Sequence, residues 1–181
     1  MLRRSGRAVL AIALVVSLAA CVETTRLPAA EPSPTAAPLF ASDEEALAAA
    51  TEAYEEYLGA LDELLKAPRQ VNAELDRVAV GQALDSARES VMEFLADGLR
   101  LSASRVLARS ELQQVFIDVS NTTVIAYFCE DITGVELIDS DGNSLTTDDR
   151  PGYTVFEASV VFEQGQALVS ERDFWSNETS C

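Results

Sequence analysis

The chain has 181 residues, of which 30 are acidic and 13 are basic, so its formal net charge at pH 7 is −17. A protein this acidic repels the phosphate backbone, which argues against nucleic acid as a partner. Histidine is absent. Its absence excludes Ser-His and Cys-His catalytic pairs and removes the commonest zinc ligand, so we expect no metal site and no cofactor.

The first twenty residues have the pattern of a secretory signal peptide. Three arginines precede an uncharged apolar run over residues 8–18, which is too short to span a bilayer as a permanent helix. The run ends in Leu18-Ala19-Ala20-Cys21, which resembles the lipobox of bacterial lipoprotein precursors. The resemblance implies removal of residues 1–20, acylation of Cys21, and a location at the extracytoplasmic face of the cell membrane. The alternative is an ordinary signal peptide that happens to precede a cysteine.

A proline-rich stretch follows the lipobox. Residues 21–41 contain four of the six prolines in the chain. Such a segment cannot bury enough apolar surface to fold, and proline favours extended conformations. We therefore expect a flexible linker at 21–41 that joins the lipid anchor to a single domain at 42–181.

Two cysteines remain once Cys21 is assigned to lipid. They are Cys129 and Cys181, and an even pair in an oxidising compartment favours a disulfide. Closing a loop of about 50 residues would stabilise the fold by roughly 4 kcal/mol in the chain-entropy model. The alternative is a pair of free thiols.

The first half of the domain has the periodicity of helices. Ser42-Asp-Glu-Glu45 is a capping box, and apolar residues then recur at three- and four-residue spacing as far as Pro68. A second helical stretch covers residues 73–97, with a break near Gly81. Gly98 is placed to end it as a left-handed cap.

The second half has the period of two that is typical of strands. The expected strands before the final hairpin are 105–108, 114–119, 123–130 and 134–139, with a turn at Asn121-Thr122. The acidic run 139–143 looks at first like a calcium loop. It lacks a glycine at the sixth position and a distal glutamate at the right spacing, both of which such a loop requires, so a tight turn is predicted instead.

The chain ends in a predicted hairpin. Strands 153–163 and 166–175 flank the two-residue turn Gln164-Gly165. A regular register would place Glu157 opposite Arg172 on one face of the hairpin. The same register would place Glu171 and Asp173 on the other, apolar face.

The order of elements predicts an α+β fold in which N-terminal helices pack on a curved antiparallel sheet. The run from Cys129 to Asn143, the closing hairpin, Trp175 and the terminal Cys181 resemble small secreted lipoproteins of actinobacteria. That resemblance implies a nuclear transport factor 2-like (cystatin-like) cone and an unassigned function. Enzymes with this cone use an Asp in it, often with His or Tyr.

These observations favour a lipid-anchored extracytoplasmic module that binds or assists another component of the cell envelope. Its expected partners are the membrane, through the lipid, and an envelope protein or a small apolar ligand. The alternative is an isomerase- or cyclase-like enzyme, with Glu171 or Asp173 as the base and Tyr127 as a donor. Passive display without a ligand is a third possibility. A deep pocket that contains one of these acids would favour the enzyme, whereas a filled interior would favour the binding module.

Overall fold

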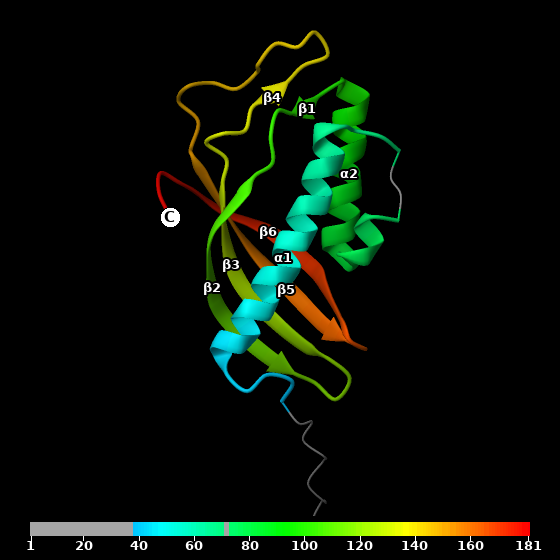
Figure 1. The fold of residues 1–181 in the computed structure, drawn as a ribbon, viewed down its shortest axis with the longest axis vertical. Coiled ribbons are helices and arrows are strands. Elements are labelled where there is room, and N and C mark those ends of the chain that lie inside the picture. The colour runs from blue at the N-terminus through cyan, green and yellow to red at the C-terminus, as the bar shows by residue number, and fades with distance from the viewer. Residues whose placement is uncertain (1–37, 71–72) are drawn as a thin grey trace, which may run out of the picture. The chain divides into compact units, whose positions relative to one another are not determined.

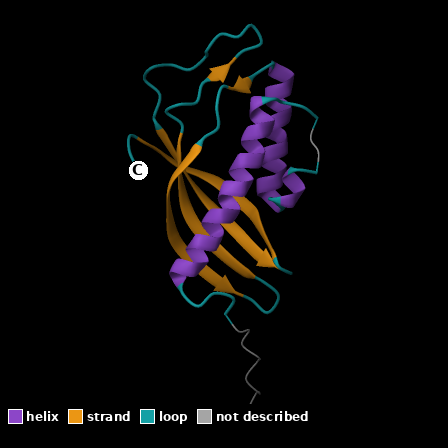
Figure 2. Ribbon diagram, viewed as in Figure 1, coloured by secondary structure: helices purple, strands orange, loops and turns teal. Residues whose placement is uncertain are grey.

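The computed structural model describes residues 38–181 except 71–72. The signal peptide, Cys21 and most of the proline-rich linker lie outside the described residues. The described part has an α+β fold in which two helices pack on one side of an antiparallel sheet (Figures 1 and 2). None of its helices has the length and apolar character needed to cross a membrane.

Helix α1 (Asp43–Lys66) begins and ends where the sequence predicted. Ser42 is its N-cap, and the Ser42 hydroxyl accepts a hydrogen bond from the Glu45 amide at 3.3 Å. The Glu45 carboxylate accepts from the amide of Ala41 at 2.7 Å, so two amides at the helix start are satisfied. The helix ends at Lys66, and its C-cap, Ala67, comes directly before Pro68, which cannot continue the helix.

The second helical stretch is shorter than predicted. Within residues 73–80 only a 3-10 turn, η1 (Leu75–Arg77), forms, and helix α2 (Gly81–Asp97) begins after it. Gly98 ends α2 in the left-handed conformation as expected. The backbone of residues 78–80 instead bonds to the edge strand of the sheet. The Val80 amide donates to the Val169 carbonyl at 2.9 Å, and the Val169 amide donates to the Val78 carbonyl at 3.0 Å.

Four long strands form the main sheet in the order β2–β3–β5–β6, and all neighbours are antiparallel. Their bounds are β2 (Val106–Ile117), β3 (Thr122–Asp131), β5 (Tyr153–Glu163) and β6 (Gln166–Glu178). The prediction of two strands in place of β2 is wrong. Two irregularities, after Leu107 and after Leu112, interrupt the period of two without ending the strand.

A second, two-stranded sheet pairs β1 (Arg100–Leu101) with β4 (Leu137–Ile138). It lies near the C-terminal end of α1, apart from the main sheet (Figure 1). The expected strand 134–139 is reduced to β4. The predicted turn after it is confirmed: the Asp139 carboxylate accepts from the amides of Asp141 at 2.9 Å and Asn143 at 2.8 Å.

The β5–β6 hairpin has the predicted turn but only part of the predicted register. Gln164 and Gly165 both have positive φ, as a two-residue hairpin turn requires. Beyond Val169 the pairing shifts by one residue, so that Ala158 lies opposite Arg172. The prediction that Glu157 faces Arg172 is therefore wrong. A bulge at Ser170 moves the following side chains to the other face.

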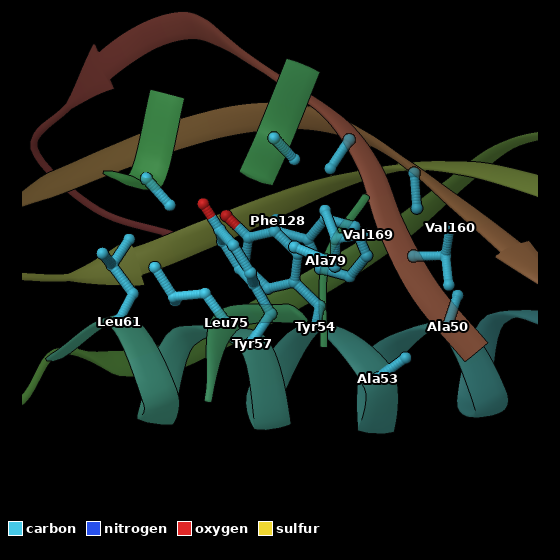
Figure 3. Close-up of a cluster of buried hydrophobic side chains, with 14 of the residues drawn as sticks. Ala50, Ala53, Tyr54, Tyr57, Leu61, Leu75, Ala79, Phe128, Val160 and Val169 are labelled. Carbon is cyan, nitrogen blue, oxygen red and sulfur yellow. The ribbon is translucent and has the colours of Figure 1, made fainter. Parts of the chain in front are cut away.

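The core lies between α1 and the inner face of the sheet. Figure 3 shows the rings of Tyr54 and Tyr57, from α1, beside Phe128 of β3. The Tyr54 and Phe128 rings stack with their centroids 3.9 Å apart, and both side chains are fully buried. The interior is therefore packed rather than hollow.

The two predicted partner cysteines lie together. Cys129 on β3 and the terminal Cys181 are at disulfide distance, with Cα atoms 6.5 Å apart. Cys129 precedes the inward-facing Glu130, so its side chain points to the outer face of the sheet. The bond thus holds the C-terminal tail against that outer face.

Candidate functional site

The interior of the fold contains a cluster of paired charges, which we call the ion cluster. Its members are Tyr54 and Asp62 of α1, Arg105 just before β2, Glu130 of β3 and Arg172 of β6. The two carboxylates and the tyrosine are fully buried, and the two arginine side chains are about nine-tenths buried.

Arg105 joins the two carboxylates of the ion cluster. Its Nε donates to Asp62 Oδ1 at 2.7 Å, and its backbone amide donates to Asp62 Oδ2 at 2.7 Å. Its Nη1 donates to Glu130 Oε2 at 3.0 Å. Arg105 Nη2 forms an ion contact with Asp62, but its geometry is not that of a hydrogen bond, and this buried nitrogen has no acceptor among the described residues.

Arg172 and Tyr54 satisfy the other oxygen of Glu130. Arg172 Nη2 donates to Glu130 Oε1 at 2.7 Å, and the Tyr54 hydroxyl donates to the same oxygen at 2.6 Å. Arg172 Nε donates in turn to the Tyr54 hydroxyl at 2.8 Å. The Arg172 guanidinium also lies over the Phe156 ring, 3.2 Å from its centroid.

The pKa values show how the ion cluster is balanced. Burial alone would raise the pKa of Glu130, but the guanidinium groups of Arg172 and Arg105 outweigh it and hold the pKa below its usual range. Burial raises the pKa of Asp62 by more than Arg105 lowers it. Burial also raises the pKa of the Tyr54 hydroxyl, which keeps it a proton donor to Glu130. With both carboxylates ionised, the two arginines make the ion cluster neutral.

None of the acids or the tyrosine proposed for an enzyme site lies in this interior. Glu171 and Asp173 are exposed on the outer face of the sheet, where Glu171 accepts a hydrogen bond from the Ser159 hydroxyl at 3.1 Å. Tyr127 lies on the same outer face, and its ring is 5.0 Å from that of Trp175. The structure places Arg172, rather than Glu171 or Asp173, against the core.

A pocket of about 390 Å³ opens beside the ion cluster. It lies between the C-terminal ends of α1 and α2, the β1–β4 sheet and the loops on either side of β4. Seven of its eleven lining residues are apolar, and the other four are Arg105, Thr146, Thr147 and Arg150. Apolar walls with a few polar groups are typical of sites for small molecules. We take it as the candidate functional site and call it the apolar pocket.

Arg150 holds one wall of the apolar pocket in place. Its Nη2 donates to the backbone carbonyls of Ile132 and Val135. On the other side, the Thr146 hydroxyl accepts from the Leu137 amide at 2.9 Å, and the Leu145 amide donates to the Leu137 carbonyl at 2.7 Å. These bonds fix the loop that carries Arg150 over the pocket.

Some of these residues carried a signal in the sequence. Asp62 continues the spacing of the buried Tyr54 and Leu58 along α1, and Glu130 continues the period of two of the buried residues of β3. A charged residue on a buried stripe indicates a buried ion pair. The inward position of Arg172 had no such signal, because it depends on the bulge at Ser170.

The described residues contain no group of three or more carboxylate or cysteine side chains placed to hold a metal ion. No model of a known protein family matches the chain, and no curated protein matches it either.

Among solved structures, the chain is similar to the intermembrane space region of the chloroplast protein ARC6, with a TM-score of 0.54 and 15% identity. The match covers 72% of this chain and 97% of that one, and it shows a shared fold only. A de novo designed beta-sheet protein matches with 18% identity over 72% of this chain and 91% of that one. Its TM-score of 0.28 is too low to support an argument.

Proposed function

We propose that this protein is a lipid-anchored extracytoplasmic lipoprotein that binds a small apolar ligand and serves the cell envelope as a binding or accessory module. The lipobox at Leu18-Ala19-Ala20-Cys21 supports the anchor, and the proline-rich linker 21–41 would hold the domain away from the membrane. In this proposal the acidic domain makes no electrostatic contact with an anionic lipid surface, and the acyl chains alone hold it there.

The apolar pocket is the observation that carries the binding proposal. Its volume of about 390 Å³ lies within the range of sites for small molecules. Leu145, on the wall of the pocket, is 51% exposed, although leucine is ordinarily buried. The packed interior supports a binding module over a cone enzyme, because the acids on which the enzyme hypothesis was based lie outside it.

As part of the same proposal, the domain is a nuclear transport factor 2-like cone. This assignment is supported by the packing of two helices on one side of a twisted four-stranded sheet (Figure 1). Within such a fold, the space that enzymes would use for substrate is occupied here by Tyr54, Phe128 and the ion cluster.

Replacement of Cys21 by Ser tests the anchor. Expressed as the full chain in a bacterial host, Cys21→Ser is expected to incorporate no labelled fatty acid and to keep its first twenty residues, because the thiol is the acylation site. Ala30→Ser, in the linker, is the matched control and should be acylated and cleaved like the unchanged chain. Normal processing of Cys21→Ser would refute the lipoprotein proposal.

A pocket-filling variant tests the binding site. The purified, unacylated full chain with its disulfide intact is titrated with decan-1-ol by calorimetry. Thr147→Trp, at an exposed position on the pocket wall, should abolish binding, whereas Thr179→Trp, exposed in the C-terminal tail, should not change it. Equal binding by both variants would show that the ligand does not occupy the apolar pocket.

A further inference from the structure

The apolar pocket differs in charge from the rest of the protein. The chain has 30 acidic and 13 basic residues, yet the pocket is lined by two arginines and by no acid. Arg105 is paired with the carboxylates of the ion cluster. Arg150 has no carboxylate within salt-bridge distance among the described residues. Since the charge of Arg105 is balanced by Asp62 and Glu130 in the ion cluster, the unbalanced charge of the pocket lining is that of Arg150.

The Arg150 guanidinium group also has N–H donors without a hydrogen-bond acceptor among the described residues. An arginine side chain carries five N–H donors, and Arg150 uses only Nη2, on two backbone carbonyls. Its Nε and Nη1 make no hydrogen bond within the described part of the chain, and they are not among its buried unsatisfied atoms. They therefore remain open to a ligand. Because Nη2 belongs to both forks of the guanidinium group and is already used, Nε or Nη1 would make a single charge-assisted hydrogen bond to one oxygen of a carboxylate or phosphate.

We propose, as a step that rests on the proposed function, that the ligand of the apolar pocket is an acyl chain with one anionic head. The head binds Arg150, and the chain lies along the apolar wall formed by residues such as Leu65, Phe94 and Leu101. The carboxylate of a fatty acid and the phosphate of a lipid share this chemistry. Arg105, which also lines the pocket, has one further buried donor, Nη2, without a hydrogen-bond acceptor among the described residues.

The surroundings limit the size and charge of this ligand. A pocket of 390 Å³ holds on the order of a dozen groups of the size of a water molecule. A neighbouring groove on the other side of Arg150 is lined by Glu136 and Asp148. Their negative charges disfavour a head group that carries several charges and extends past Arg150. A chain of about ten carbons with a single charge fits both limits.

Four ligands with the same chain test the head group. Decanoate, methyl decyl phosphate (a phosphodiester with a single charge), decan-1-ol and decyltrimethylammonium are titrated, below their micellar concentrations, into the unacylated full chain. A charge-assisted hydrogen bond predicts that an anion binds about 10- to 100-fold more tightly than decan-1-ol. The cation should bind most weakly. Tighter binding of decanoate than of methyl decyl phosphate would identify a fatty acid as the source, and the reverse would identify a phospholipid.

Charge variants locate the head. Arg150→Gln should remove the preference for the anion over decan-1-ol. Arg100→Gln is the matched control, since Arg100 is exposed on β1 and does not line the pocket, and it should keep the preference. Leu145→Glu should weaken decanoate binding more than Leu145→Gln does. The Leu145 pair tests the position of the head even if Arg150→Gln does not fold. Leu145 is half exposed, so its substitution is expected to leave the fold intact.

The outcomes separate the two proposals. Equal affinity for decanoate and decan-1-ol, with both still blocked by Thr147→Trp, would overturn the anionic head and leave the apolar binding site. A folded Arg150→Gln variant that kept the preference for the anion would also overturn the anionic head. Equal decanoate affinity of Leu145→Glu and Leu145→Gln would overturn it as well. Binding that Thr147→Trp does not affect would overturn both proposals.

Discussion

The ion cluster and the apolar pocket share Arg105 but differ in how their charges are met. In the ion cluster, two carboxylates and two guanidinium groups face one another, and Glu130 accepts from Arg105, Arg172 and Tyr54. In the pocket, the only partners of Arg150 among residues 38–70 and 73–181 are two neutral backbone carbonyls. A buried charge that is fully paired contributes to the fold, whereas a charge left with free donors is available to a ligand.

The largest effect should come from breaking the ion cluster. Glu130→Ala leaves Arg105 and Arg172 buried without their shared partner, which is expected to cost about 3–5 kcal/mol of unfolding free energy. Denaturant unfolding measures it. Glu136→Ala, an exposed acid beside β4, should change the stability by less than about 0.5 kcal/mol. Equal effects of the two variants would show that the ion cluster is not structural.

Removal of the disulfide should have the next largest effect. Cys129 lies next to Glu130 in β3 but on the outer face, and the bond closes a sequence separation of 52 residues. Its loss in the double variant Cys129→Ala, Cys181→Ala is expected to cost about 2–4 kcal/mol. Decan-1-ol binding to the folded variant should not change, because the pocket does not contact the bond. Loss of binding in the folded variant would contradict this separation of the two regions.

Acid should weaken the ion cluster through Glu130. Its pKa is lower in the folded state than the ordinary value of 4.5, so the unfolded chain takes up the proton at higher pH. The stability from Glu130 is therefore complete above about pH 4.5 and is lost as the pH falls through the folded pKa, by at most about 1.4 kcal/mol per pH unit. Glu130→Gln should flatten this slope in chemical unfolding measured between pH 5 and pH 3.

Asp62 should act with the opposite sign. Its pKa is raised above 3.8 in the folded state, so the folded protein binds this proton more tightly than the unfolded chain does. The stability that Asp62 contributes is therefore complete below about pH 3.8 and is lost as the pH rises through the folded pKa. Asp62→Asn should therefore make the net loss of stability in acid steeper. A flatter slope in Asp62→Asn would show that Arg105, and not burial, sets the pKa of Asp62.

The smallest effect on stability should come from Arg150. Arg150→Gln removes a charge that has no ionic partner among the described residues, and glutamine can still donate to a carbonyl, so the expected cost is about 1 kcal/mol. Thermal unfolding of Arg150→Gln beside Arg100→Gln measures it. A cost as large as that of Glu130→Ala would mean that Arg150 belongs to the structure rather than to the binding site.

The sequence predicted those parts of the fold that depend on local signals. The capping box at Ser42 located the start of α1, Gly98 located the end of α2, and Gln164-Gly165 located the last turn. Each is fixed by residues within a few positions of one another. The pairing of Cys129 with Cys181 was predicted from the even number of cysteines left after Cys21 and from the expectation of an oxidising compartment.

The face occupied by Arg172 was not predictable in this way. The bulge at Ser170 has no glycine or proline to mark it, and contacts distant in sequence accompany it. Val78 and Val80 bond to Val169, and the Arg172 amide donates to the Gln82 side chain at 2.9 Å. The apolar pocket is equally remote from local signals, because its walls come from both helices and from two loops.

The bulge at Ser170 also determines where the chain can change in length. In β6 two residues, Ser170 and Glu171, lie opposite the single Ser159. Removal of Ser170 would make this part of the ladder regular and leave Arg172 facing the core. Val169 and Ala167 each pair with a single residue of β5. Removal of either would move the side chains on one side of the deletion to the opposite face of the sheet, so that charged residues of the outer face would be buried. A deletion of one residue at Ser170 therefore needs no compensating substitutions elsewhere in β5 or β6.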